Sequence, residues 1–126
     1  EDEDTFVKAD VDAIERVLLN LIHNAIKFTR GGGIIVISTI LQKDTVLISV
    51  ADNGIGIEKD ELDMIWERFY KSDKSRGQHK SGTGLGLAIV KNIINEHGQN
   101  VWVESEIGKG TVFYFTLERS GKGAER

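Results

Sequence analysis

Two pairs of strand-like segments constrain the fold of this chain more than any other feature of its sequence. Residues 34–41 and 45–51 are rich in β-branched and apolar side chains, and the polar stretch 42–44 between them predicts a hairpin. Segments 101–105 and 111–117 have the same character, and a glycine-rich turn joins them. The chain therefore contains two hairpins that must each bury an apolar face.

The rest of the chain shows helical periodicity. Apolar residues three and four positions apart predict a long helix that Asp10 caps and that runs to about Thr29. A second long helix is expected over 85–97, where Gly98 stops it, and a short one over 58–69. The apolar stripe of the first helix comprises Val11, Ile14, Leu18, Leu21, Ile22 and Ala25.

The order of these elements is helix, hairpin, short helix, loop, helix and hairpin. It predicts the α+β class and a two-layer α/β sandwich, in which one sheet carries its helices on a single face. We expect one domain over 6–118, a frayed N-terminal end over 1–5 and a flexible C-terminal tail over 119–126.

Composition excludes some classes of protein. The 126 residues suit one domain, and 40% hydrophobic residues supply one core. A formal net charge of -4 argues against a nucleic-acid binder held by bulk positive charge. There is no cysteine for a disulfide or a thiolate metal site, and no apolar run has the length of a membrane span.

The first chemical motif lies in the first helix, where residues 20–28 read Asn-Leu-Ile-His-Asn-Ala-Ile-Lys-Phe. At about 100° per residue, Asn20, Asn24 and Lys27 share one side of the helix, away from the apolar stripe. Amide oxygens can ligate Mg²⁺ and an ammonium group can meet a phosphate, so the motif suits a metal-nucleotide. A solvated helix face explains this motif alone equally well.

The second motif, Asp-Asn-Gly-Ile-Gly-Ile at 52–57, follows a strand directly. The carboxylate of Asp52 can accept the exocyclic amine of adenine, whereas guanine presents a carbonyl at that position. Gly54 and Gly56 let backbone approach a flat ring closely, and the isoleucines supply apolar walls. The alternative is an ordinary glycine-rich turn.

The third motif, Gly-Thr-Gly-Leu-Gly-Leu-Ala at 82–88, opens the last helix. Exposed amides at a helix start can bind phosphates. The spacing is neither that of a dinucleotide fingerprint nor that of a Walker loop, so a plain glycine-rich helix entry is the alternative.

Taken together, the three motifs resemble the N, G1 and G2 boxes of the histidine kinase ATP-binding domain, and 67–71 resembles its F box. The resemblance covers roughly 6–117. The family belongs to a superfamily that also holds type II topoisomerases. It implies a Bergerat-type ATP-binding fold: a mixed sheet of about five strands with three helices on one face. An ATP lid is expected over about 58–83, and the implied cofactors are ATP and Mg²⁺.

The resemblance also assigns roles. Asn24 matches a Mg²⁺-ligating asparagine, with Asn20 one turn before it. Lys71 lies where many relatives have an arginine near the γ-phosphate. The expected catalytic residues are Asn20, Lys27 and Lys71. The expected nucleotide-binding residues are Asn24, Lys27, Phe28, Asp52, Gly54, Gly56, Ile57, Phe69, Tyr70, Lys71, Gly82, Thr83, Gly84, Leu85, Gly86 and Leu87.

The implied function is that of a protein-histidine kinase in a two-component system. It passes the γ-phosphate of ATP to a histidine on a dimeric helical phosphoacceptor domain of the same protein, which then serves a response regulator. Relatives that hydrolyse ATP have a glutamate where this chain has Asn20, and an asparagine cannot act as a general base, which favours transfer over hydrolysis. A serine kinase of the anti-sigma type and a non-catalytic nucleotide-binding regulator are the alternatives. The domain is expected to be cytoplasmic, although the full-length protein can be anchored in a membrane. The domain itself is expected to contact neither nucleic acid nor membrane.

Other conspicuous residues have structural interpretations. His23, His79 and His97 lack the His-Glu or His-Asp context of a phosphoacceptor. A cation at His97 would suit the end of the last helix. Trp66 and Trp102 are expected to pack rather than to stack on a ligand.

Overall fold

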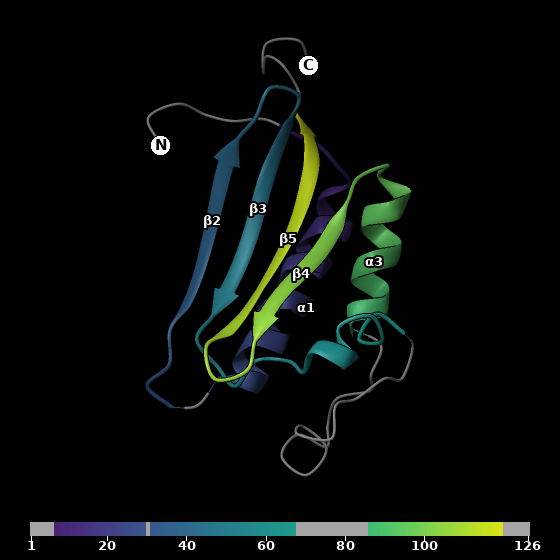
Figure 1. The fold of residues 1–126 in the computed structure, drawn as a ribbon. Helices are drawn as coiled ribbons and strands as arrows, with labels where there is room; N and C mark the ends of the chain where they lie inside the picture. Colours follow the sequence, from purple (N-terminus) through teal and green to yellow (C-terminus); the bar gives the residue numbers. More distant parts are fainter. Residues whose placement is uncertain (1–6, 30, 68–85, 120–126) are drawn as a thin grey trace.

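The computed structural model describes residues 7–29, 31–67 and 86–119 (Figure 1). Its strands are β1 (Val7–Lys8), β2 (Ile35–Leu41), β3 (Thr45–Asp52), β4 (Val101–Glu106) and β5 (Gly110–Arg119). Its helices are α1 (Val11–Phe28) and α3 (Gly86–Glu96), and η1 (Lys59–Glu61) is a single 3₁₀ turn. Both hairpins and both long helices therefore lie within two residues of the predicted positions.

The strands form one antiparallel sheet. β2 pairs with β3, β3 with β5, and β5 with both β1 and β4. The prediction of a mixed sheet is wrong for the described strands, because the two hairpins join through their second strands, β3 and β5, which run antiparallel. Four strands have six or more residues, and the sheet reaches five only when the two-residue β1 is counted.

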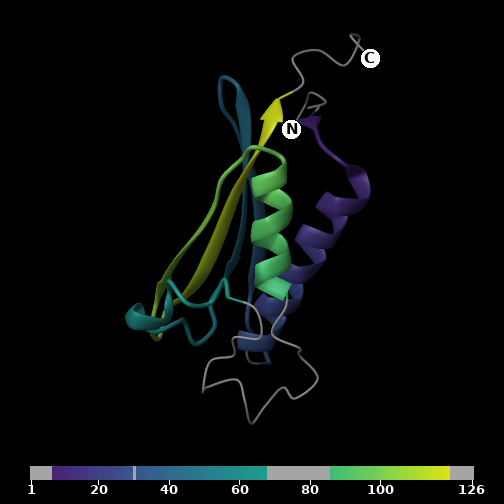
Figure 2. The same cartoon turned by 90° about the vertical axis from the view of Figure 1, so that its right-hand side faces the viewer.

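The core lies between the sheet and the two helices, which cover the same face (Figure 2). Alternate residues of β3 point into it, as expected for a strand with one covered face. Among the described residues, no helix is long and apolar enough to cross a membrane. The most deeply buried side chains are Val17 and Leu21 of α1, Val50 of β3, Val90 and Ile94 of α3, and Phe113 and Phe115 of β5.

The third helix expected over 58–69 is not regular within the described residues. Its backbone bonds span three residues, from the amide of Glu61 to the carbonyl of Glu58 and from that of Met64 to that of Glu61. Only η1 has helical geometry, and turns follow it. A helix this short is marginal on its own, and here Ile65 is buried in the core and Trp66 packs against it.

The helix ends agree with the sequence. Asp10 caps α1, since its carboxylate oxygen accepts the amide of Ala13 at 3.0 Å. His97 follows α3 and links it to α1. Its Nε2 accepts the Asp10 amide at 3.1 Å, while Nδ1 lies 2.9 Å from the Ile93 carbonyl oxygen and can donate to it. The ring thus connects the two helices through hydrogen bonds at both of its nitrogens.

β2 forms an edge of the sheet and lies beyond the helices (Figure 1). Six of its seven residues are exposed, in contrast to the half-buried alternation of β3. Its exposed side chains on the helix side include Ile37, and those on the open side include Val36 and Ile40. The strand therefore presents apolar side chains on both faces.

Candidate functional site

The site is built around the 52–57 turn, which is fixed against the end of α1. The amide of Ile55 donates to the carbonyl of Phe28 at 3.1 Å. A Cβ at Gly54 would overlap that same carbonyl oxygen, so only glycine allows the two segments to approach this closely. The contact brings the second sequence motif beside the C-terminal turn of α1, which carries the first.

Asp52 ends β3 at this point and is buried, with 8% of its surface exposed. Its Oδ1 accepts the amide of Gly54 at 2.8 Å. Burial raises the pKa of the Asp52 carboxyl above 3.8, while backbone hydrogen bonds from Gly54 and Thr111 lower it and only partly offset the effect of burial. A buried carboxylate with acceptor capacity left over suits a ligand that offers an N–H donor.

The second half of the turn is held by the β4–β5 hairpin. Gly56 has φ of 83°, and a Cβ there would collide with the carbonyl of Glu106. The amide of Ile57 donates to Ser105 Oγ at 2.8 Å, and the Ile57 side chain is buried in the core. The turn is therefore wedged between α1 on one side and the hairpin on the other.

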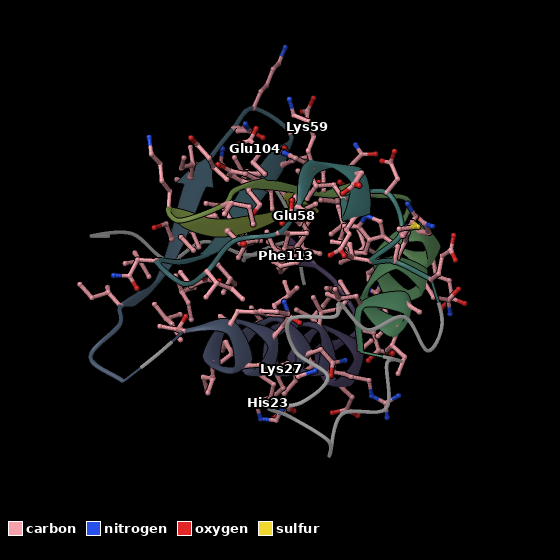
Figure 3. All side chains as sticks on the ribbon, turned by 60° about the horizontal axis from the view of Figure 1, so that its bottom comes forward. His23, Lys27, Glu58, Lys59, Glu104 and Phe113 are labelled. Atoms are coloured by element: carbon pink, nitrogen blue, oxygen red, sulfur yellow. The ribbon has the colours of Figure 1, made fainter. Side chains whose placement is uncertain are left out.

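The polar residues of α1 lie closer to the core than the periodicity predicted, which put them away from the apolar stripe. Asn20, Asn24 and Lys27 are half-buried on the flank beside the buried stripe. Asn20 faces the start of α3, because a Cβ at Gly86 would lie 3.5 Å from its Oδ1. Figure 3 views this end of the molecule: Lys27 and His23 stand on α1, and Phe113 lies on the sheet side.

Several predicted site residues lie outside the described part of the chain: Phe69, Tyr70, Lys71, Gly82, Thr83, Gly84 and Leu85, and with them most of the expected lid. Phe28, Gly86 and Leu87 are described, and each is half-buried. Leu87 packs against the core. The described residues thus bring the first two motifs and the first turn of α3 to one end of the sandwich.

A pocket of about 380 Å³ opens on the outer side of the 52–57 turn. It shares Gly54 with the predicted base pocket but does not include Asp52. Its lining also comprises Gly31, Gly32, Gly33, Asn53, Ile55 and Gly108. Because the Asp52 carboxylate is absent from its lining, this pocket differs from the predicted base pocket.

The β4–β5 hairpin contributes to the site, which the sequence alone did not lead us to expect. Thr111 is buried opposite Asp52 in the sheet, and its backbone bonds to that carboxylate. Ser105 Oγ bonds to Ile57, to the Gly110 carbonyl at 2.9 Å and to Thr111 Oγ1 at 2.7 Å. The signal was the segment Gly-Lys-Gly-Thr at 108–111, which we interpreted as a turn only.

Comparison with known proteins decides the family. The model of the family described as "Histidine kinase-, DNA gyrase B-, and HSP90-like ATPase" matches residues 9–121. The chain belongs to this family. Its membership confirms the resemblance drawn from the three motifs.

Named relatives of this ATPase-family domain are sensor histidine kinases. The chain is 44% identical over 118 residues to the sensor histidine kinase WalK of Bacillus subtilis (strain 168), covering 92% of this chain and 19% of WalK. The chain thus spans about a fifth of the length of that curated relative.

Solved structures of histidine kinases have the same fold as this chain. The mycobacterial sensor histidine kinase MprB has a TM-score of 0.82 and 28% identity, over 91% of this chain and 78% of that one. Full-length ShkA in complex with AMPPNP has a TM-score of 0.79 and 31% identity, over 94% of this chain and 24% of ShkA. The α+β fold of this ATPase-family domain is therefore that of histidine kinase catalytic domains.

Proposed function

We propose that this domain binds ATP with Mg²⁺ and donates the γ-phosphate to a histidine on a separate phosphoacceptor domain. The observation that carries the proposal is the bond between Ile55 and Phe28, which holds the buried Asp52 carboxylate and the polar flank of α1 at one end of the molecule. A carboxylate that can bind the base and polar groups that can bind the phosphates, placed at opposite ends of one site, suit a nucleoside triphosphate.

The base is expected to lie against the 52–57 turn. Asp52 accepts the exocyclic amine of adenine, and this hydrogen bond is charge-assisted in a buried setting. Gly54 and Gly56 give the ring room, and Ile57 and Phe28 provide apolar contact. Phe69 and Tyr70 would close over the nucleotide from the lid.

The triphosphate is expected to lie between α1 and the start of α3. Lys27 contacts a phosphate, and the helix entry from Gly82 to Leu87 supplies amide donors. The half-buried amides of Asn20 and Asn24 offer neutral oxygens of the kind that Mg²⁺ accepts, so the described residues fit the ion. When bound, Mg²⁺ neutralises charge on the phosphates.

Transfer then depends on positioning more than on covalent chemistry by this domain. An imidazole nitrogen of the acceptor histidine forms the new bond to the γ-phosphorus, the bond to the bridging oxygen breaks, and ADP leaves. Asn20 cannot deprotonate water, so hydrolysis is slow. Lys71 and Lys27 compensate charge on the phosphates.

The remaining partners belong to the whole protein. We propose that the acceptor histidine lies on a dimeric helical domain of the same polypeptide and that a response regulator takes the phosphate from it. We further propose that the catalytic domain acts in the cytoplasm.

The nucleotide assignment is tested by calorimetry with ATP and GTP in the presence of Mg²⁺. Loss of one charge-assisted hydrogen bond costs about 1.5–3 kcal/mol, so GTP should bind roughly tenfold or more weakly. Asp52→Asn should weaken ATP by the same order and leave GTP nearly unchanged. Equal affinity of the wild-type chain for the two nucleotides would refute the assignment.

Transfer is tested by adding a dimeric acceptor domain in trans. The chain alone should hydrolyse labelled ATP very slowly and acquire no label, and the acceptor should gain an acid-labile, base-stable phosphate. Asn24→Ala should abolish labelling with the fold intact. Acid-stable label would point to a serine kinase, and nucleotide binding without any transfer would point to a regulator.

A further inference from the structure

We propose that β2 is a homotypic interface, at which the edge strands of two copies of this chain pair antiparallel to form one continuous sheet. This proposal is independent of the nucleotide chemistry, because β2 contributes none of the site residues. It rests on the hydrogen-bonding edge of β2, its side chains and its symmetry.

β2 has one hydrogen-bonding edge that no described strand covers. β2 bonds to β3 through alternate residues, which include Ile34, whose carbonyl accepts the Asn53 amide, and Gln42, whose amide donates to Thr45. In an antiparallel ladder the residues between them point the other way. Ile35, Ile37, Thr39 and Leu41 therefore present their amides and carbonyls outward, and no described strand pairs with them.

The sequence of β2 has none of the features that normally protect an edge strand from pairing. Edge strands are normally guarded by charged side chains, proline, a bulge or very short length. β2 has seven residues, Ile-Val-Ile-Ser-Thr-Ile-Leu, with no charge and no proline, and its register with β3 is unbroken. The opposite edge strand, β4, carries Glu104 and Glu106.

The pairing of β2 with its own copy indicates that the occupant is a second copy of this chain. A twofold axis through Ser38 places Ile37 opposite Thr39, Val36 opposite Ile40 and Ile35 opposite Leu41 of the partner. Each pair joins side chains of the same face, because odd residues lie on the helix side and even residues on the open side. Two of these three pairs join aliphatic side chains and none opposes like charges, so the strand can pair with its own copy in an isologous interface.

The exposed apolar area of the β2 edge determines how tightly two copies can associate. Five aliphatic side chains, Ile34, Val36, Ile37, Ile40 and Leu41, are between 39% and 60% exposed. A fully buried aliphatic side chain removes roughly 60–120 Å² from water, so the edge supplies roughly 150–300 Å² of apolar surface per copy. About eight backbone hydrogen bonds add to it. A stable dimer buries about 800 Å² per partner, so the pairing should be weak and reversible.

Sedimentation velocity of the chain without nucleotide, from about 10 μM to about 1 mM, tests the inference in the range expected for a small interface. A reversible monomer–dimer equilibrium is expected. Amide hydrogen exchange at high concentration should slow at residues 35, 37, 39 and 41 and stay unchanged at 36, 38 and 40, which already bond to β3. A monomer throughout, or open-ended aggregation, overturns the proposal.

Charged substitutions of Ser38, the residue on the proposed twofold axis, test the register of the pairing. Ser38→Lys and Ser38→Glu each place like charges opposite one another, so each variant alone should dimerise at least tenfold more weakly. A mixture of the two should recover dimers. Asn95→Lys, an exposed change on α3, is the matched control and should dimerise like wild type. Unchanged dimers of Ser38→Lys, or a mixture that fails to associate, overturns this pairing.

Discussion

At the scale of single residues, Asp52 combines two opposed requirements, burial in the sandwich and a negative charge. Its hydrogen bonds from Gly54 and Thr111 favour the carboxylate, but burial outweighs them and raises its pKa. A carboxyl group held in this way lowers the stability of the fold when it ionises, and groups with perturbed pKa values cluster at functional sites.

The pH dependence of stability follows from that shift. Because the folded-state pKa of Asp52 lies above 3.8, ionisation destabilises the fold at pH values above the folded pKa. The cost disappears as pH falls through that value toward 3.8. The unfolding free energy of wild type should therefore rise relative to that of Asp52→Asn between pH 7 and about pH 4. Denaturant unfolding of both proteins measures this, and the comparison cancels the other carboxylates. A difference that is constant with pH contradicts it.

Gly54 gives a second prediction at the residue scale. A methyl group there would overlap the Phe28 carbonyl, whereas one at Gly31 would meet no atom within 4 Å. Gly54→Ala should therefore lower the unfolding free energy by about 2 kcal/mol or more and weaken ATP binding, while Gly31→Ala should change it by less than about 0.5 kcal/mol. Thermal unfolding and calorimetry of both variants check it. Equal effects of the two substitutions would show that the close approach is not needed.

At the scale of elements, patterns with strong local periodicity were predictable and those fixed by distant partners were not. α1 follows from Asp10 and its helical periodicity, although Val11 of the predicted stripe is exposed and the buried Val17 was not included in it. The β2–β3 hairpin follows from β-branched residues around a polar turn. The two residues of β1 carry no such pattern, because only their pairing with Glu118 and Arg119 makes them a strand. The turns after η1 likewise depend on distant partners, since Ile65 is buried in the core.

The His97 link between α3 and α1 is a further long-range feature. His97→Ala removes the acceptor of the Asp10 amide and a bond to the Ile93 carbonyl. We expect the unfolding free energy to fall by about 1–2 kcal/mol, and amide exchange in the first turn of α1 to accelerate. Asn95→Ala, an exposed change in the last turn of α3, should have little effect. Unchanged exchange at Ala13 in the His97 variant would argue that the link is incidental.

At the scale of the whole molecule, the order of elements predicted the two layers and the single covered face. The assignment of Asn20, Asn24, Lys27 and Asp52 to one site came from the resemblance to the histidine kinase motifs, and not from the order of elements. Sequence reasoning failed to include Thr111 and Ser105, because they reach the site through the register of β4 and β5 with the rest of the sheet. Register between distant strands is set by the packed core, and local pattern does not reveal it.

The proposed site would bind Mg²⁺ only together with a nucleotide. The candidate ligands, Asn20 and Asn24, are neutral amides, and Mg²⁺ usually binds through carboxylates or through phosphates of a substrate. Mg²⁺ titrated into the chain alone should give no measurable heat at micromolar concentrations, whereas with a non-hydrolysable ATP analogue it should bind, and Asn24→Ala should weaken that binding about tenfold or more. Tight binding to the nucleotide-free chain would mean that other ligands hold the ion.

The pairing of β1 with the last residues of β5 has a mechanical consequence. Val7 lies opposite Arg119, so the polypeptide enters and leaves the sheet side by side, at the end remote from Asp52 (Figure 1). A pull applied across these two points would load the hydrogen bonds of the pair one after another, as in opening a zipper, and not all at once. Tension on the polypeptide should therefore peel β1 away at low force and leave the nucleotide end of the sandwich undisturbed.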